Sequence, residues 1–361
     1  MYFKNINEIT QGTIDDFKLS KNFLLIFVAE KSASEVGTLI DLLDKNALKF
    51  FGGVYPTIIH DIHNYHDGIL IIEVPHVQEV IKFSMKDEST FREIKNLEGV
   101  NTAILLIDAM VSETDLLLKK VYGLLNNQIN IVGGGAGFMS FEQQPCIFTQ
   151  DGMFDDGAIL ALLSNKSKIG VKHGWEVFAG PFIATSTEKN IVKELNWRPA
   201  FEVYKEVIEA NSTNEFTENN FIDIAKIFPF GIYKEGAEFV VRDPIAINEE
   251  GEIVCISEVP ENSTLQILTG DPEKLILAAR DVANQTYHEE SAAECLMVFD
   301  CITRVMYLDK QFEDELKAMR DVYRKKQCKI RGVSTLGEIA SSGMGFVDFY
   351  NKTIVASSLY R

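Results

Sequence analysis

Cys301 and Arg304 are the two residues whose types and spacing come closest to reactive chemistry. They stand at the end of the apolar run CLMVFDC (295–301). A guanidinium near a thiol stabilises the thiolate, which is the reactive form of cysteine. No histidine neighbours Cys301 in sequence to act as a base for acyl transfer. Two interpretations stay open for Cys301: the nucleophile of a cysteine-dependent enzyme, or a small buried hydrophobic residue.

Arginine offers a second kind of chemistry, the recognition of carboxylates. Arg304 follows an apolar strand, and a buried arginine needs a carboxylate partner. Glu338 is the natural partner within the chain, and the carboxylate of a ligand is the functional alternative. Arg242 poses the same choice in the segment VRDP, where Asp243 is a ready local partner.

Histidine could present a ring nitrogen to a ligand or to a haem iron. His173 lies beside Trp175 in KHGWEVFAGP. The alternative is a turn histidine bonded to the backbone, with Trp175 in the core. The series His60, His63 and His66 could hold zinc or supply one haem ligand. In an extended segment residues three apart point to opposite faces, so we expect a solvated hairpin and no metal site.

The stretch INIVGGGAGF (129–138) resembles a phosphate-binding loop only at first sight. Nucleotide-binding loops place glycines between a strand and the following helix. Here the glycines come after a helix, and no G-K-[ST] follows them. Gly133 and Gly134 therefore indicate a crowded sheet position, where another backbone or a ligand approaches closely. We expect no nucleotide binding.

These residues belong to a unit that the chain repeats three times. Each unit has a buried apolar strand, a helix, a glycine-containing extended segment and a closing strand. Ser112 and Asp115 predict a capping box at the start of the second helix. The first strands of the three units are FLLIFVA (23–29), AILLIDA (103–109) and CLMVFDC (295–301). The sequence predicts an α/β fold of mixed α+β type, in which repeated strand–helix–strand–strand units form mixed sheets with helices packed on their faces.

A different region separates the second and third units. It reads as two strands, a helix that starts near Pro199, a polar stretch NSTNEFTENN (211–220) and several short strands. The polar stretch is the best candidate linker. We therefore expect an N-terminal domain at 1–210 and a C-terminal domain at 221–361.

The bulk composition excludes several classes of function. The chain has 361 residues and a formal charge of −18, which argues against nucleic-acid binding. A basic run at 323–331 is expected to end a helix, where cations suit the negative dipole end. The five cysteines form no C-x-x-C pair, and no signal peptide or run of transmembrane length is present. We expect a cytoplasmic protein that does not contact a membrane.

Across nearly its whole length the chain resembles the FIST family. It carries short motifs in the order found in FIST proteins: GGVYP, HDG, GGGAG, HGWEVFAGPF, RPAFEVY, FPFG, VRDP, CITR (301–304), GEI (337–339) and NKT (351–353). The resemblance implies two FIST halves and a sensory, ligand-binding role in bacterial signal transduction. Amino acids have been proposed as ligands of the family, and one branch consists of haem proteins that sense nitric oxide.

The resemblance implies a stand-alone sensor without catalytic activity, since no kinase, cyclase or receptor segment is recognisable. It would report to a separate partner such as a histidine kinase, and a homo-oligomer stays open. We expect a small-molecule pocket between the two halves. Haem is the alternative ligand, with His173 or His60 on the iron. The expected ligand-binding residues are Gly133, Gly134, His173, Trp175, Arg242, Cys301, Arg304, Glu338 and Asn351.

Overall fold

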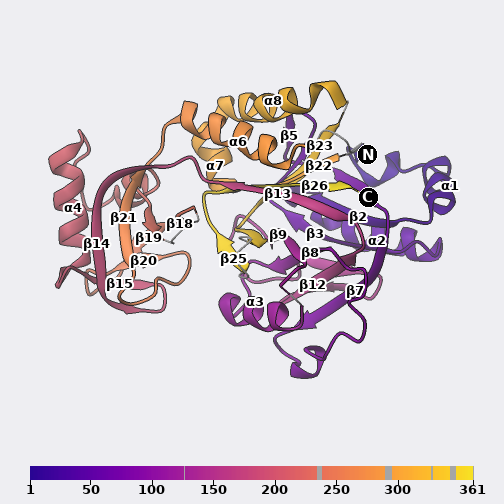
Figure 1. Ribbon diagram of the computed structural model, residues 1–361, viewed down its shortest axis with the longest axis horizontal. Coiled ribbons are helices and arrows are strands. Elements are labelled where there is room, and N and C mark those ends of the chain that lie inside the picture. Colours follow the sequence, from indigo (N-terminus) through magenta and orange to yellow (C-terminus); the bar gives the residue numbers. More distant parts are fainter. Residues whose placement is uncertain (126, 234–237, 289–294, 327, 342–346, 361) are drawn as a thin grey trace. The chain divides into compact units, whose positions relative to one another are not determined.

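The computed structural model separates the chain into two compact units (Figure 1). Unit 1 contains residues 1–172, 279–349 and 354–361, and unit 2 contains residues 173–278 and 350–353. Unit 2 thus interrupts the sequence of unit 1. The halves at 1–210 and 221–361 stay a prediction about the family domains. The structure describes residues 1–125, 127–233, 238–288, 295–326, 328–341 and 347–360.

Unit 1 contains the three predicted repeats, each here grouped with the elements that flank it; the first part of α6 belongs to unit 2. The first contains β1 (Tyr2–Phe3), α1 (Gln11–Ser20), β2 (Phe23–Ala29), α2 (Val36–Lys45), β3 (Phe50–Tyr55), β4 (Thr57–His60), β5 (His63–Tyr65) and β6 (Ile69–Val74). The second contains β7 (Val77–Ser84), β8 (Thr102–Asp108), α3 (Thr114–Gly123), β9 (Asn130–Ala136), β10 (Ile147–Thr149), β11 (Gly152–Phe154) and β12 (Gly157–Leu163). The third contains β13 (Lys166–Lys172), α6 (Pro272–Thr286), β22 (Cys295–Cys301), α7 (Ile302–Leu308), α8 (Phe312–Tyr323), β23 (Lys329–Thr335), β24 (Glu338–Ser341), β25 (Val347–Tyr350) and β26 (Ile354–Tyr360).

The three repeats form three six-stranded sheets with the same strand arrangement. In each sheet the first long strand pairs in parallel with the glycine strand and antiparallel with the closing strand. The strand orders are β1-β6-β2-β3-β10-β11, β7-β12-β8-β9-β24-β25 and β13-β26-β22-β23-β4-β5. The predicted mixed α/β architecture is therefore confirmed.

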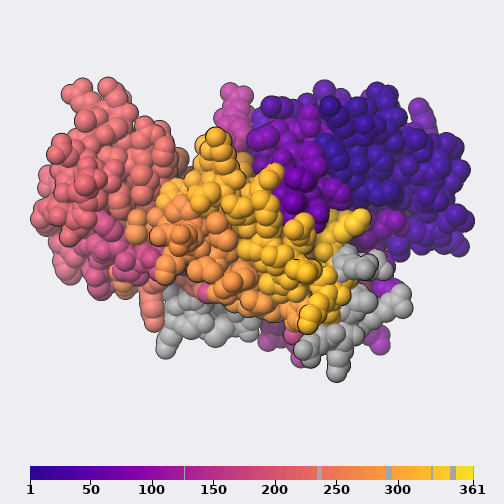
Figure 2. Space-filling view, turned by 90° about the horizontal axis from the view of Figure 1, so that it is seen from above, coloured from indigo at the N-terminus to yellow at the C-terminus, as the bar shows by residue number. Residues whose placement is uncertain are grey.

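The sheets exchange hairpins in a closed cycle. The hairpin β4–β5 of the first repeat extends the sheet of the third, and β24 of the third extends the sheet of the second. The hairpin β10–β11 of the second repeat then extends the sheet of the first. Figure 2 shows the purple surface of the early strands beside the yellow surface of the C-terminal elements. Unit 1 is therefore built jointly by the two ends of the chain.

A glycine occupies the same register position in each parallel pair. Gly52 lies opposite Ile26, Gly133 opposite Leu105, and Gly332 opposite Val298. A Cβ at these glycines would lie only 2.1, 1.7 and 1.9 Å from the carbonyl oxygen of the facing residue. Because such contacts are impossible, the backbone itself requires glycine at this position.

Helices cover the outer faces of the sheets through apolar stripes. Val36, Leu39 and Leu43 of α2 pack on β2, and Leu117 and Val121 of α3 pack on β8 and β12. In Figure 1 α8 lies along the sheet of β22 and β23. The predicted capping box is wrong, because α3 begins at Thr114 after Glu113, which makes no side-chain cap.

The described residues of unit 2 form a single antiparallel sheet, with the helices α4 and α5 and the start of α6. Its long strand β14 (Glu176–Glu188) has two register shifts against β15 (Ile191–Leu195) and two against β21 (Thr264–Thr269). The short strand β16 (Arg198–Pro199) pairs with β15. The expected helix near Pro199 is confirmed, and 211–220 holds no strand and no helix beyond the end of α4. The elements are β14 (Glu176–Glu188), β15 (Ile191–Leu195), β16 (Arg198–Pro199), α4 (Ala200–Asn211), α5 (Phe221–Ala225), β17 (Phe230–Ile232), β18 (Val240–Arg242), β19 (Pro244–Ile247), β20 (Ile253–Cys255) and β21 (Thr264–Thr269).

Candidate functional site

One group of expected residues gathers at the carboxyl edge of the parallel pair β22–β23 in unit 1. Asp300 and Cys301 end β22, and Thr335 ends β23. Glu338 begins β24, and its carboxylate accepts a hydrogen bond of 2.7 Å from Thr335 Oγ1. Ligands of α/β proteins commonly bind at the carboxyl ends of parallel strands. This edge is therefore a suitable place for a ligand.

Arg304 lies in a helix and not at a strand end, which corrects the sequence-based expectation. β22 ends at Cys301, and the chain turns directly into α7. Arg304 Nε donates to Asp300 Oδ1 at 3.1 Å, and Arg304 Nη2 donates to Glu315 Oε2 of α8 at 2.8 Å. Both carboxylates are fully buried with the guanidinium. Arg304 is thus held by two acids that the sequence analysis did not name.

The group formed by Asp300, Arg304, Glu315 and Glu338, here called the acid cluster, contains more acids than cations. All four side chains are fully buried. Three carboxyl groups accompany one guanidinium, so full ionisation would leave two negative charges unbalanced. Burial and then the charge of Glu315 raise the pKa of Asp300 well above its usual range, although Arg304 acts in the opposite direction. Burial of the cluster therefore favours the protonated form of Asp300 over the charged form.

Asp300 also departs from the internal repeat. It lies two residues after Val298. Val298 pairs with Gly332, the glycine that takes the same register position in all three repeats. The same position holds Val28 in the first repeat and Ile107 in the second. All three side chains are fully buried. Burying a carboxyl group where the fold accepts an aliphatic side chain costs free energy, so the fold does not explain Asp300.

The two glycines of the expected site pack against neighbouring strands. Gly133 and Gly134 lie in β9, which pairs with β8 and with β24. A Cβ on Gly134 would lie 2.6 Å from Cγ2 of Thr335. The missing Cβ thus brings β9 of the N-terminal half against the threonine that binds Glu338.

Cys301 is a buried thiol beside a hydroxyl group. Its side chain is 3% exposed, and its Sγ lies 3.0 Å from the hydroxyl of Thr303. A threonine hydroxyl is not a base at neutral pH, so this contact does not generate a thiolate. The geometry favours the reading of Cys301 as a buried packing residue.

His173 and Trp175 belong to unit 2 and contact groups of the protein. The Trp175 backbone N–H donates to His173 Nδ1 at 2.8 Å, which places the ring proton on Nε2. Nε2 then lies 3.1 Å from a carboxylate oxygen of Glu238. The indole N–H of Trp175 donates to the carbonyl of Lys352 at 3.2 Å. Nδ1 of His173 is therefore hydrogen-bonded, and Nε2 lies within ion-pair distance of Glu238.

Lys352 forms a buried ion pair in the same unit. Its Nζ lies 3.0 Å from Asp243 Oδ1 and donates to the carbonyl of Lys226 at 3.0 Å. It also lies 4.6 Å from the centre of the Trp175 ring. Burial raises the pKa of Asp243, and Lys352 opposes that rise. One cation and one carboxylate balance each other here.

Arg242 and Asn351, the last two expected residues, also lie in unit 2. Arg242 donates from Nε to the carbonyl of Glu258 at 2.8 Å and from Nη1 to the carbonyl of Val241 at 3.0 Å. Asn351 accepts a hydrogen bond of 3.3 Å from Ser257 Oγ. The VRDP and NKT motifs thus meet in unit 2 and brace its loops.

The residues expected to hold haem do not fit that group. Iron would have to displace either the Trp175 N–H or Glu238 from His173. His60 lies opposite His63 in the predicted hairpin, beside a hollow of about 300 Å³. That volume is at the small end of ligand pockets and does not suit a porphyrin. Within the described residues, no group of three or more His, Cys, Asp or Glu is arranged to hold a metal ion.

The nine expected residues are divided between the two units. Unit 1 holds Gly133, Gly134, Cys301, Arg304 and Glu338, and unit 2 holds His173, Trp175, Arg242 and Asn351. Asp300, Glu315 and Lys352 were not among the site residues expected from the sequence. Asp300 was detectable as an acid inside an apolar strand, but nothing in the sequence linked Glu315 or Lys352 to a site.

Comparison with protein families supports the resemblance seen in the motifs. A model described as the FIST N domain matches residues 8–198, and a model described as the FIST C domain matches residues 200–341. A comparison with curated proteins found no match. In the part of the chain that the structure describes, no helix is long and apolar enough to span a membrane.

Proposed function

Because this chain belongs to the FIST family, whose domains are sensory domains of signal transduction, we propose that it binds a small molecule at the acid cluster of unit 1. It then passes the signal to a separate partner such as a histidine kinase. The observation that carries this proposal is Asp300, a buried carboxyl group where the other two repeats have Val28 and Ile107.

Residues of both family halves meet beside the acid cluster, whose four members all lie in the C-terminal half. Gly134 comes from the N-terminal half, and Thr335 and Glu338 come from the C-terminal half. Ligand binding there would depend on the correct pairing of β9 with β24. This arrangement supports the expectation of a pocket shared by the two halves.

The charge of the cluster favours a ligand that carries an ammonium group. Arg304 is already bound by Asp300 and Glu315, so a ligand carboxylate would have to displace an internal partner. The excess of carboxyl groups instead suits a positive charge, which would offset the burial and the charge of Glu315 that disfavour ionised Asp300. An amino acid, the ligand class proposed for the family, supplies such a group.

The complete burial of the cluster fits a sensory role. A ligand reaches fully buried side chains only if part of unit 1 opens. A ligand that stabilises one of two conformations shifts their populations by its difference in affinity. Binding and conformational change would therefore be coupled, which a sensor requires.

A thermal-shift screen of the full chain with the common amino acids tests the proposal. At least one amino acid should raise the melting temperature saturably, since a ligand of the folded state stabilises it. Glu338→Gln should weaken that ligand by roughly tenfold, because it removes a charge-assisted contact. Glu313→Gln, an exposed residue of α8, is the matched control and should change nothing. If no amino acid shifts the melting temperature, or if Glu338→Gln binds as well as wild type, the proposal fails.

Two further measurements test the alternatives. NAD, FAD, ATP and GTP should not shift the melting temperature, because the glycines follow a helix and fill a packed sheet. The absorption spectrum of the purified protein should show no Soret band. A Soret band would instead favour the haem-binding branch of the family.

A further inference from the structure

The basic run after α8 lies outside the proposed ligand site. α8 ends at Tyr323, a short 3-10 helix covers Arg324–Lys326, and β23 begins at Lys329. Cations near the end of a helix suit its negative dipole end, which accounts for Arg320 and Arg324. The dipole does not account for Lys329, because this residue belongs to a strand.

These cations share a hollow on the surface of unit 1. Its cavity volume is about 300 Å³, and Tyr323 and Cys328 are its buried members. The basic side chains reach it from the end of α8, from the 3-10 helix and from β23. The residues that line it are His60, Asp61, Arg320, Tyr323, Arg324, Cys328 and Lys329.

The hollow is positively charged in a strongly acidic chain. Arg320, Arg324 and Lys329 supply three cations, and Asp61 is the one carboxylate among the described lining residues. Asp61 lies 3.9 Å from Arg320, with side chains 41% and 39% exposed, which makes a weak pair. Three cations minus one carboxylate leave two positive charges, against −18 for the whole chain.

Unused hydrogen-bonding groups lie at the same place. Nδ1 of His60 and Nε of Arg331 are buried and have no hydrogen-bond partner within the described residues. The two residues face each other across the β4–β23 pair. Buried polar atoms without partners are uncommon in folded proteins. Of the two, His60 lines the hollow, and Arg331 is its neighbour on the adjacent strand. A group with oxygens in the hollow would give the His60 ring a hydrogen-bond partner.

We propose that this hollow binds a small phosphate-class anion, either inorganic phosphate or the phosphate group of a small metabolite. Two guanidinium forks and an ammonium group match the oxygens of a phosphate. The small volume excludes a nucleotide. The site is distinct from the acid cluster, because Lys329 and Thr335 stand at opposite ends of β23, about 20 Å apart at the usual rise of a strand.

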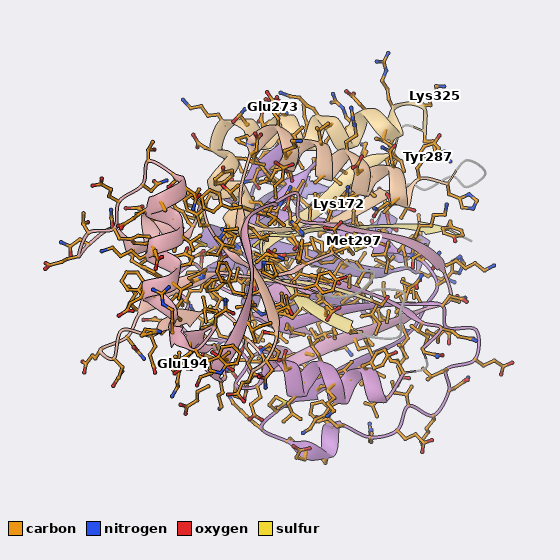
Figure 3. All side chains as sticks on the ribbon, turned by 60° about the vertical axis from the view of Figure 1, so that its left-hand side comes forward. Lys172, Glu194, Glu273, Tyr287, Met297 and Lys325 are labelled. Carbon is orange, nitrogen blue, oxygen red and sulfur yellow. The ribbon has the colours of Figure 1, made fainter. Side chains whose placement is uncertain are left out.

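Calorimetric titration of the full chain with inorganic phosphate tests this proposal at constant ionic strength, with chloride as the replaced anion. Saturable binding is expected for wild type. Arg324→Gln and Lys329→Gln should each weaken it several-fold, and the double variant should weaken it by roughly tenfold or more. Lys325→Gln is the matched control, since Lys325 is exposed, lies in the same basic run and does not line the hollow (Figure 3).

The outcomes separate a built site from diffuse charge. Absence of saturable phosphate binding overturns the proposal, and so does an equal loss in Lys325→Gln and Arg324→Gln. O-phosphoserine identifies the source of the anion: tighter binding than phosphate indicates a phosphorylated metabolite, and weaker binding indicates free phosphate. Arg324 and Lys329 are exposed, so both variants should keep the far-UV circular dichroism of wild type. If one variant misfolds, the phosphate affinity of the other variant still tests the proposal.

Discussion

Unit 1 and unit 2 each bury a cation, but they neutralise it in different ways. In unit 2 Lys352 meets the single carboxylate of Asp243, a backbone carbonyl and the face of Trp175. In unit 1 Arg304 meets Asp300 and Glu315, and Glu338 adds a third acid to the cluster. The ion pair of unit 2 is balanced, whereas the acid cluster of unit 1 is not.

This difference separates a structural brace from a candidate binding site. A balanced buried pair needs no further partner, and its loss is felt only in stability. An unbalanced cluster must hold a proton or admit a cation, so its state depends on pH and on ligands. Four changes to the chain test this contrast.

The largest effect is expected from the fragment 1–210, which lacks both Arg304 and Lys352. It also removes β22, β23, β24 and β26, so the hairpin β4–β5 and the strand β13 lose their sheet. We expect an aggregation-prone fragment without a cooperative unfolding transition. Circular dichroism and thermal unfolding measure this. A cooperative transition like that of the full chain would show that the exchange of hairpins is not needed for folding.

Lys352→Met should cost about 3–5 kcal/mol, because it leaves Asp243 buried without its cation. Denaturant unfolding measures the loss. Replacing both residues, with Asp243→Leu added, should recover much of the stability. Lys226→Met changes an exposed lysine and serves as the control. A small loss in Lys352→Met would mean that Asp243 takes up a proton at little cost.

Arg304→Lys should cost about 1–3 kcal/mol, because an ammonium group cannot bond both Asp300 and Glu315 as the guanidinium does. The positive charge is kept, so the loss should be smaller than for Lys352→Met. Affinity for any amino-acid ligand found in the screen should fall in the same variant. If both stability and affinity are unchanged, Arg304 is not the centre of the cluster.

Asp300→Asn should alter how stability depends on pH. An acid whose pKa is raised on folding binds its proton more tightly in the folded state, so stability falls as the pH rises above the ordinary value of 3.8. The variant lacks this titration. Its melting temperature should therefore improve relative to wild type as the pH rises above 3.8. If the melting temperatures of the variant and of wild type change in parallel with pH, the pKa of Asp300 is not raised on folding.

Local pattern was enough to predict the repeat. The runs at 23–29, 103–109 and 295–301 became β2, β8 and β22, because continuous apolar residues are typical of strands buried on both faces. Motif order was enough to identify the family. The start of α3 was predicted wrongly, because the cap depends on local geometry that Ser112 and Asp115 do not fix by themselves.

The division of the chain into halves at 211–220 stays a prediction about the family domains. The compact units are instead defined by contacts in space, which place residues 279–349 in the same unit as residues 1–172. Which hairpin joins which sheet cannot be read from periodicity, because the three repeats have the same pattern. Only the paired strands show that β4, β10 and β24 each extend the sheet of another repeat.

The sequence by itself determined the repeat, the family and the glycine positions, because each depends on residues close together in the chain or on their order. The tertiary structure decided which charges meet. Arg304 was expected to meet Glu338 or a ligand, yet Glu315 from α8 and Asp300 from β22 hold it. Electrostatic partners are chosen by distance in space and by burial, and neither follows from spacing along the chain.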